Sequence, residues 1–216
     1  MPATVSEKTI GRLSLYRRLL YELRSAGEEN LYSHQLAQMA GVTAAQVRRD
    51  LMSIGYSGSP TRGYDVRELG ESIGRFLDSP IDQGVALVGV GNLGRAIMAF
   101  FAGRRPHLRI VAAFDTDPYK VNRVIQGVRC YSLEQMPQVV ESEGIQVGIL
   151  AVPAVAAQGA ADTLVRAGVR GLLNFAPVPL RVAPDIYVED IDMTMSLEKV
   201  AYFARQRATQ KELQTW

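Results

Sequence analysis

Three closely spaced glycines are the residues whose spacing points most directly to chemistry. The short apolar run Val85–Val88 leads straight into Gly89-Val90-Gly91-Asn92-Leu93-Gly94, which matches the pattern G-x-G-x-x-G. In this pattern the first glycine permits a tight turn, the second lets the backbone approach a pyrophosphate, and the third lets a helix pack closely on the preceding strand. Free amides at the positive end of that helix then hold the phosphates. The spacing predicts a dinucleotide site, with a merely structural turn as the alternative.

A carboxylate follows this loop at the distance that such a site requires. Asp115 comes directly after the next apolar run and lies 21 residues beyond Gly94. This offset suits a carboxylate that accepts hydrogen bonds from the adenosine ribose. Because Asp115 and the nearby Asp117 would repel a 2′-phosphate, we expect NAD⁺ and NADH rather than NADP⁺ and NADPH. Lys120 and Arg123 lie close by in the chain and keep the phosphorylated coenzymes open.

Side chains that could catalyse a reaction are scarce in this half of the chain. His107 stands in a polar stretch, and no tyrosine there is followed four residues later by lysine. The chain after Pro80 suffices for a nucleotide fold and leaves no room for a substrate domain. Cys130 has no neighbouring base and is expected to be a small buried residue. With only His34, His107 and Cys130 available, we expect no metal site and no intrachain disulfide. The pattern favours a site that binds without catalysis.

Two alternatives remain open at this point. The first is a small NAD-dependent oxidoreductase that uses Asp192 as its acid. The second keeps the fold but binds a CoA-type nucleotide, since such nucleotides use similar glycine turns.

The chain after Pro80 has the pattern of an α/β protein with a parallel sheet. Short continuous apolar runs, typical of strands buried on both faces, alternate with longer helical stretches. The expected strands are Val85–Val88, Ile110–Phe114, Val147–Val152, Leu172–Phe175 and Ile186–Val188, and the expected helices are Leu93–Gly103, Leu133–Glu143 and Val155–Ala167. This alternation predicts helices on both faces of the sheet and right-handed crossovers.

The first part of the chain is predicted to be helical. Helices are expected over Thr9–Ala26, from Ser33, whose hydroxyl would cap its helix, and from Ala44 to about Ile54, capped by Thr43. A turn at Gly41 separates the last two, so residues 16–55 have the layout of a helix-turn-helix. A loop rich in glycine, serine and proline follows, and a fourth helix, capped by Asp65, ends near Ser79-Pro80, where we expect a domain boundary.

The third helix carries side chains suited to reading DNA. Its exposed side presents Gln46, Arg48, Arg49 and Ser53. In the major groove, arginine can pair bidentately with guanine and glutamine with adenine, while neighbouring polar groups such as Ser33 and Thr43 can hold phosphates. The following loop, which bears Arg62, would act as a wing that contacts a minor groove or the DNA backbone. The alternative is a helical cap whose arginines are simply solvated.

Composition agrees with an ordinary globular protein, since 47% of the 216 residues are hydrophobic and 21% are charged. The net charge is only +2, but residues 1–64 carry eight basic against five acidic side chains, which points weakly to an anionic partner. No apolar run approaches the ~20 residues that span a bilayer. The N-terminus also lacks the apolar core of a signal peptide, so we expect a cytoplasmic protein without a membrane partner.

Taken together, these segments resemble the Rex family of bacterial redox-sensing transcriptional repressors. The resemblance extends over nearly the whole chain and depends on the order and spacing of its motifs. They are Leu36-Ala37 through Gly41–Leu51, Arg62-Gly63-Tyr64, Gly89–Gly94, Phe114-Asp115-Thr116-Asp117-Pro118, Ala151-Val152-Pro153 and Leu173-Asn174-Phe175-Ala176-Pro177. It implies that Thr116, Val152, Pro153, Asn174 and Phe175 join the glycine loop, Asp115 and Asp117 in binding the cofactor.

The resemblance also implies an architecture and a mode of action. Residues 1–79 would form a winged-helix DNA-binding domain, residues 80–192 a Rossmann-type NAD(H)-binding domain, and residues 193–216 a C-terminal helix exchanged between the subunits of a homodimer. The implied protein is a repressor rather than an enzyme. It would sense the NADH/NAD⁺ ratio, bind palindromic operator DNA with NAD⁺ or no ligand, and be released by NADH.

Three further residues are implied to couple the cofactor to DNA binding. Arg18 and Asp192 match a family pair proposed to link the first helix to the nicotinamide pocket. Phe100 stands where the family usually has tyrosine, so a switch contact through a hydroxyl is in question there. In the last helix, the stretch Ser196–Arg207 carries one apolar stripe, whose partner is either a second subunit or its own.

Overall fold

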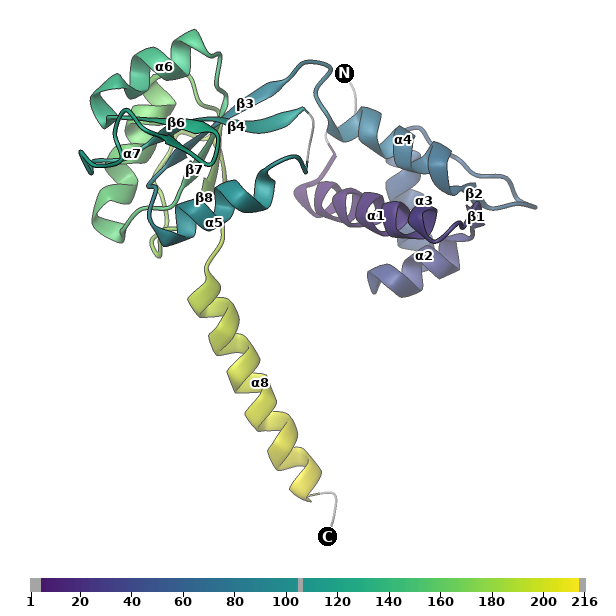
Figure 1. The fold of residues 1–216 in the computed structure, drawn as a ribbon. Helices are drawn as coiled ribbons and strands as arrows, with labels where there is room; N and C mark the ends of the chain where they lie inside the picture. Colours follow the sequence, from purple (N-terminus) through teal and green to yellow (C-terminus); the bar gives the residue numbers. More distant parts are fainter. Residues whose placement is uncertain (1–4, 105–106, 214–216) are drawn as a thin grey trace. The chain divides into compact units, whose positions relative to one another are not determined.

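The computed structural model describes residues 5–104 and 107–213. The chain divides into two compact units, Met1–Pro80 and Ile81–Trp216 (Figure 1). Within the described residues, no helix is both long and apolar enough to cross a bilayer.

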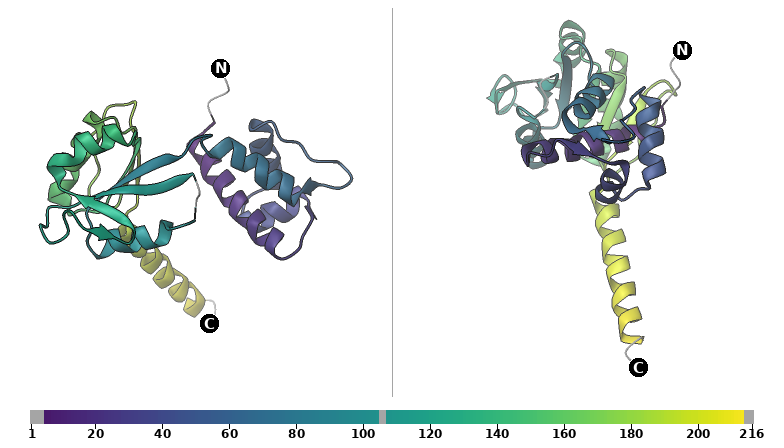
Figure 2. Two further views of the ribbon diagram at one scale, coloured as in Figure 1. Left: turned by 45° about the horizontal axis from the view of Figure 1, so that its top comes forward. Right: turned by 90° about the vertical axis from the view of Figure 1, so that its right-hand side faces the viewer.

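The first unit consists of four helices and a two-stranded sheet. Its elements are α1 (Glu7–Ser25), β1 (Asn30–Leu31), α2 (Ser33–Ala40), α3 (Ala44–Ser53), β2 (Tyr64–Asp65) and α4 (Val66–Leu77). The strands β1 and β2 are antiparallel, and α1 and α4 lie side by side (Figure 2). Apolar side chains from all four helices, among them Leu13, Leu36, Leu51 and Leu69, form one buried core. This core fixes α2 and α3 as a helix-turn-helix.

Side-chain caps set the starts of these helices. The Thr43 hydroxyl accepts a hydrogen bond from the backbone N–H of Gln46 at 3.1 Å, and Asp65 accepts one from Glu68 at 2.8 Å, as the sequence predicted. The expected cap at Ser33 is wrong. Tyr32, with extended backbone, takes the N-cap position of α2 and leaves Ser33 as the first helical residue. The backbone N–H of Tyr32 donates to the side-chain oxygen of Gln35 at 2.7 Å, which completes that end of the helix.

The loop between α3 and β2 forms a small hairpin. Ser59 and Gly63 exchange backbone hydrogen bonds of 2.7 and 2.8 Å, and the Tyr32 hydroxyl donates to the carbonyl of Thr61 at 2.9 Å. Gly63 adopts a φ of 73°, and a Cβ there would overlap the carbonyl of Leu31, so only glycine fits this position. The loop therefore lies against the start of α2 as a wing.

The second unit contains a seven-stranded sheet within the described residues. Its strands are β3 (Gln83–Val88), β4 (Leu108–Phe114), β5 (Val124–Ile125), β6 (Val128–Tyr131), β7 (Val147–Leu150), β8 (Gly171–Asn174) and β9 (Tyr187–Asp190). The spatial order is β5-β6-β4-β3-β7-β8-β9, and β5 alone among these strands is antiparallel to its neighbour. Without β5, this is the 3-2-1-4-5-6 order of dinucleotide-binding sheets.

Helices cover both faces of this sheet. They are α5 (Asn92–Phe101), the 3₁₀ turn η1 (Leu133–Gln135), α6 (Met136–Ser142) and α7 (Ala154–Arg166). The C-terminal α8 (Met193–Leu213) adds no side chain to either layer, since residues 193–207 are all exposed. Side chains of α6 and α7 pack with Ala86 and Val88 on one face. Those of α5 pack with Val85 and Leu87 on the other. Because consecutive residues of β3 serve opposite faces, the strand reads as one continuous apolar run.

Candidate nucleotide site and nucleic-acid interface

The glycine loop lies at the point where the order of the sheet reverses. β4 pairs with one side of β3 and β7 with the other, so a crevice is expected beyond the carboxyl ends of β3 and β7, where open α/β sheets bind ligands. Gly89 follows β3 immediately, and Gly91 is the N-cap of α5. The first amides of α5 therefore point into the place where a diphosphate would bind.

The three glycines of the loop play different structural parts. Gly89 has a φ of 95°, and a Cβ there would overlap the carbonyl of Ala151. A Cβ on Gly94 would overlap the carbonyl of Gly89, so this glycine lets α5 approach the loop. At Gly91, by contrast, nothing among the described residues lies within 4 Å of an added Cβ. That free space beside the helix N-terminus fits a pyrophosphate approaching the backbone.

Asp115 closes the glycine loop from the end of β4. Its Oδ2 accepts a hydrogen bond from the backbone N–H of Val90 at 2.8 Å, and its Oδ1 accepts one from Asp117 at 2.9 Å. Burial alone would raise the pKa of Asp115, but these N–H groups and the Lys120 ammonium hold that pKa below its ordinary value. The carboxylate is thus charged and fixed, and Oδ1 keeps a free lone pair for a ribose hydroxyl.

Lys120 is the residue of this site whose contact the sequence did not reveal. Its Nζ lies 3.1 Å from Oδ2 of Asp115 and 3.5 Å from Oδ2 of Asp117. The signal was present in the spacing, since lysine follows the first carboxylate by five residues, but only the fold of the loop brings the groups together. The ammonium offsets part of the negative charge that would repel a 2′-phosphate.

Of the remaining residues expected at the cofactor, Thr116 follows β4, and the others lie at the ends of the neighbouring strands β7 and β8. Val152 and Pro153 lie just after β7, and Pro153 is the N-cap of α7. The backbone N–H of Phe175 donates to the carbonyl of Leu150 at 2.9 Å, which holds the segment after β8 beside β7. These residues line the same edge of the sheet as the glycine loop.

Asn174 is buried and uses its amide inside the protein. Its Nδ2 donates to the carbonyl of Val178 at 2.8 Å and to the carboxylate of Asp190 at 2.7 Å, while its Oδ1 accepts from the N–H of Ala176 at 3.0 Å. The amide therefore shapes the turn after β8 and ties it to the end of β9, a part that the sequence did not predict. Cys130 is fully buried, as expected, and burial raises the pKa of its thiol.

In the first unit, α3 presents its arginines to solvent. Arg48 and Arg49 are exposed; the guanidinium of Arg48 donates to the Ser33 hydroxyl at 3.0 Å and that of Arg49 to the side-chain oxygen of Gln46 at 2.9 Å. The Ser53 hydroxyl donates back to the carbonyl of Asp50 at 2.6 Å. Arg62 is exposed in the wing. This distribution of donors suits a polyanionic partner.

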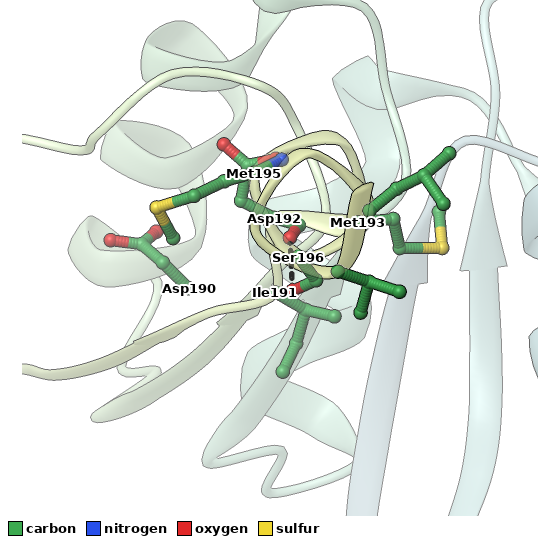
Figure 3. Close-up of a pocket in the computed structure, with 8 residues that line it drawn as sticks. Asp190, Ile191, Asp192, Met193, Met195 and Ser196 are labelled. Carbon is green, nitrogen blue, oxygen red and sulfur yellow. Dashed lines mark hydrogen bonds between the residues drawn. The ribbon is translucent and has the colours of Figure 1, made fainter. Parts of the chain in front are cut away.

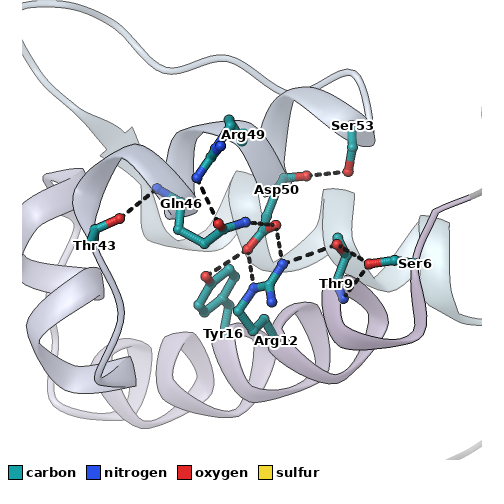
Figure 4. A network of polar contacts seen from close by, with 9 residues as sticks. All are labelled: Ser6, Thr9, Arg12, Tyr16, Thr43, Gln46, Arg49, Asp50 and Ser53. Atoms are coloured by element: carbon teal, nitrogen blue, oxygen red, sulfur yellow. Dashed lines mark hydrogen bonds and ion pairs between the residues drawn. The ribbon is translucent and has the colours of Figure 1, made fainter.

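A buried carboxylate, which the sequence analysis missed, anchors α3 to α1. Asp50 is 2% exposed and accepts two hydrogen bonds from Arg12, at 2.6 and 2.7 Å, and one from the Tyr16 hydroxyl at 2.9 Å (Figure 4). Gln46 donates a further one at 2.8 Å. Burial alone would raise the pKa of Asp50, but these donors hold that pKa below its ordinary value. The helix α3 is thus fixed on α1 by charge as well as by packing.

The residues expected to couple the two activities are distributed over both units. Arg18 is exposed on α1 in the first unit. In the second unit, Phe100 is exposed, with the guanidinium of Arg104 4.1 Å above its ring. Asp192 accepts from the backbone N–H of Met195 at 2.8 Å and lines a hollow of about 430 Å³ at the start of α8 (Figure 3). The pairing of Arg18 with Asp192 stays a prediction.

Comparison with known proteins decides the family. Over 205 residues the chain is 39% identical to the redox-sensing transcriptional repressor Rex of Rhodopirellula baltica, a match that covers 95% of this chain and 86% of that protein. The chain belongs to the Rex family of redox-sensing transcriptional repressors. The Rex protein of Carboxydothermus hydrogenoformans is 38% identical over 201 residues, covering 93% of this chain and 97% of its own.

Solved structures of another Rex-family repressor match nearly the whole chain, and two family models each match one part of it. The crystal structure of RSP, a Rex-family repressor, with β-NAD⁺ and operator DNA matches with a TM-score of 0.88 at 32% identity, covering 98% of both chains. RSP with β-NADH matches with a TM-score of 0.85 at 32% identity, covering 98% of this chain and 99% of RSP. Residues 81–178 match a family model described as a CoA binding domain, and residues 4–51 match a putative DNA-binding protein N-terminus.

Proposed function

We propose that this chain is a transcriptional repressor that binds palindromic operator DNA as a homodimer, with NAD⁺ or without ligand, and leaves the DNA when NADH binds. The observation that carries the proposal is the joining of two sites in one chain. A helix-turn-helix with exposed arginines precedes a sheet whose reversal point holds an open glycine loop. RSP, which this chain matches over 98% of its length, has been solved with each form of the coenzyme. We place this activity in the cytoplasm.

The nucleotide end of the proposal rests on the edge of the sheet around β3. The backbone of residues 89–94 would hold the diphosphate, because the amides at the start of α5 lie beside the free space at Gly91. Asp115 would accept from the ribose, with Thr116 and Asp117 beside it. Val152, Pro153 and the turn held by Asn174 and Phe175 would border the nicotinamide. When bound, the coenzyme supplies a ring that is cationic in NAD⁺ and neutral in NADH.

The DNA end of the proposal rests on α3 and the wing. Arg49 would read a base, because its guanidinium is exposed and keeps donors that no group of the described residues uses. Arg48, Ser33, Thr43, Ser53 and Arg62 would contact the backbone and set the register. In a homodimer two such helices must lie about one helical turn, ~34 Å, or a multiple of it apart to read a palindrome. Residues 1–79, 80–192 and 193–216 would serve DNA binding, coenzyme binding and dimerisation.

Sensing requires that coenzyme binding and operator binding influence each other. If NADH favours a dimer whose reading helices no longer match the half-sites, operator DNA must weaken NADH binding by the same factor. A coupling of about 1–3 kcal/mol, or about 5- to 150-fold, suffices for a useful response. Arg18, Phe100 and Asp192 would carry it, because Arg18 and Asp192 match the family pair proposed to link the first helix to the nicotinamide pocket.

A CoA-type nucleotide is the second candidate ligand, because residues 81–178 match the CoA binding domain model. Whole-chain identity to Rex repressors supports NAD(H) instead. Competition separates the two: ADP, which shares the adenosine diphosphate of NADH, should displace bound NADH, and CoA should not. Displacement by CoA at lower concentration than ADP would favour the second candidate.

Fluorescence anisotropy of a labelled palindromic duplex tests the proposal directly. We expect the full-length protein to bind the duplex in buffer and with saturating NAD⁺, and to release it as NADH is added. A duplex of the same composition in scrambled order is the control for non-specific binding. If saturating NADH leaves the anisotropy of the palindromic complex unchanged, the proposed function is wrong.

A further inference from the structure

Gln46 occupies the exposed helix that would read DNA, yet both ends of its amide are already in use. Its Nε2 donates to Oδ1 of Asp50 at 2.8 Å, and its Oε1 accepts from the guanidinium of Arg49 at 2.9 Å (Figure 4). All three residues lie on α3. Arg49 and Asp50 come three and four positions after Gln46, a spacing at which the side chains of a helix are neighbours.

The buried carboxylate dictates which way this amide points. An ionised aspartate can only accept, so Gln46 must turn its NH₂ group toward Asp50. The carbonyl oxygen of the same amide then faces away, toward Arg49. Asp50 itself cannot rotate freely, because Arg12 and the buried Tyr16 donate to both of its oxygens. The side chains of α1 therefore orient Asp50. Asp50 orients the amide of Gln46, and that amide orients the guanidinium of Arg49.

We propose that Gln46 is a positioning residue that fixes the guanidinium of Arg49 for base recognition, and that it does not read a base itself. The inference rests on the proposed function, in which α3 enters the major groove. A glutamine that recognises adenine must present its N–H and its oxygen to one base edge together. The two atoms of Gln46 are directed to different partners, whereas Arg49 uses one donor on Gln46 and keeps others for a guanine.

Releasing Gln46 to read a base would bring little net gain. The buried carboxylate of Asp50 would lose one of the four hydrogen bonds that it accepts. The free-energy cost of that loss is of the same order as the free energy gained from a bidentate base contact. Arg49 would also lose its restraint and regain rotamer freedom that binding must remove again. Because Gln46 already restrains Arg49 in the free protein, less conformational entropy is lost when DNA binds.

A base-pair substitution scan of one operator half-site distinguishes positioning from reading. Wild type, Gln46→Met, Arg49→Ala and the double variant are compared; methionine keeps the length of glutamine and removes both hydrogen bonds. We expect Gln46→Met to reduce discrimination about tenfold at the base pair where Arg49→Ala reduces it, and the double variant to match Arg49→Ala there. Gln146→Met, at an exposed glutamine of the second unit, is the matched control.

Two outcomes of the scan overturn the inference. The first is loss of discrimination in Gln46→Met at a pair that Arg49→Ala still discriminates, which would make Gln46 a base reader. The second is full discrimination in Gln46→Met, which would make the contact irrelevant.

A measurement without DNA keeps this inference separate from the proposed function. The heteronuclear NOE of the Arg49 Nε–H group reports its order in the free protein, and we expect it to fall in Gln46→Met and to stay unchanged in Gln146→Met. An unchanged value in Gln46→Met overturns the positioning role. Failure of the wild type to prefer the palindrome over a scrambled duplex is instead a failure of the proposed function.

Discussion

The Lys120 ammonium lies 3.1 Å from Oδ2 of Asp115, the carboxylate that closes the glycine loop. The same oxygen accepts from the backbone N–H of Val90, so the lysine is tied to the loop through one carboxylate. A group that the sequence shows only as a neighbour thus belongs to the adenosine end of the site. Its charge weakens the repulsion by which Asp115 and Asp117 would reject a 2′-phosphate.

Replacing this lysine should sharpen the choice between coenzymes. In Lys120→Met the carboxylates keep their charge without a nearby cation, so NADPH should lose more affinity than NADH. The pair is partly exposed, and its contribution of about 1 kcal/mol corresponds to a roughly fivefold rise in the ratio of the two dissociation constants. Coenzyme fluorescence titration measures both constants. Arg123→Met, at an exposed cation on the same loop, should leave the ratio unchanged; an unchanged ratio in Lys120→Met would contradict the prediction.

Sequence predicted most of the fold because its signals are local. Continuous apolar runs marked β3, β4, β7 and β8, and the caps at Thr43 and Asp65 set the helix starts. The strands β5 and β6 were missed. The short run of β6 through Arg129 alternates polar and apolar residues and becomes a strand by pairing with β4, while β5 pairs with β6. The local sequence does not show which neighbouring strand will pair with such a segment.

The candidate sites were predicted less completely for a related reason. Sequence indicated which residues meet at the sheet edge but not the direction of their polar atoms, so Asn174 and Gln46 were expected to face ligands. In the structure both amides are held by internal partners. Asp50 carried a readable signal, since it lies three residues after Val47 and one before Leu51, on the face that becomes buried. A carboxylate there must find a cation.

Loss of the Asp50 charge should weaken the first unit selectively. In Asp50→Asn the amide brings its own donors toward Arg12, so the bidentate ion pair is lost. Arg12 keeps some solvent exposure, which limits the expected cost to about 2 kcal/mol. Hydrogen exchange followed by mass spectrometry on the full chain measures this as faster exchange in α1 and α3 peptides. Asp78→Asn, which removes an ion pair with Arg17 in which the carboxylate is 41% exposed, should change protection less.

Acid should remove the same stabilisation. The pKa of Asp50 is lower in the folded protein than in the unfolded chain, so the carboxylate stabilises the fold fully above the unfolded pKa of about 4. This contribution is lost as pH falls through the folded value. The difference in α1 and α3 protection between wild type and Asp50→Asn should therefore be full at pH 6 and shrink at lower pH. A difference that grows with acid would contradict the sign.

Two glycines of the loop should separate binding from folding. Gly91→Ala meets nothing within 4 Å among the described residues and should leave the melting temperature nearly unchanged, while its methyl group occupies the approach of the pyrophosphate. We expect NADH affinity to fall by at least about tenfold, in line with one lost charge-assisted contact of about 1.5–3 kcal/mol. Gly94→Ala collides with the Gly89 carbonyl and should lower the melting temperature itself. Unimpaired NADH binding by Gly91→Ala would place the diphosphate elsewhere.

Asn174 and Asp190 should behave as a matched pair. Asn174 is 1% exposed, and Asn174→Asp sets a carboxylate against Asp190 and against the carbonyl of Val178, with a cost of about 3 kcal/mol. Adding Asp190→Asn returns a donor to the contact, so the double variant should recover part of the melting temperature. Asp190→Asn alone should cost little, because its amide oxygen still accepts from Asn174. Absence of any recovery in the double variant would show that the contact does not govern this turn.

Substitution of the apolar side chains of α8 should show whether this helix holds a dimer together. Leu197 and Val200 are 69% and 66% exposed and lie three residues apart on one face of the helix. Burying each against a partner would contribute about 1.5–3 kcal/mol, so Leu197→Asp with Val200→Asp should raise the dimer dissociation constant at least about 100-fold. Sedimentation equilibrium reads this directly, with Lys199→Gln as the control on the same helix. A monomer retains one reading helix and binds a palindrome no better than a half-site, so operator affinity should fall in parallel. If the doubly substituted chain stays dimeric, the partner of α8 is its own subunit.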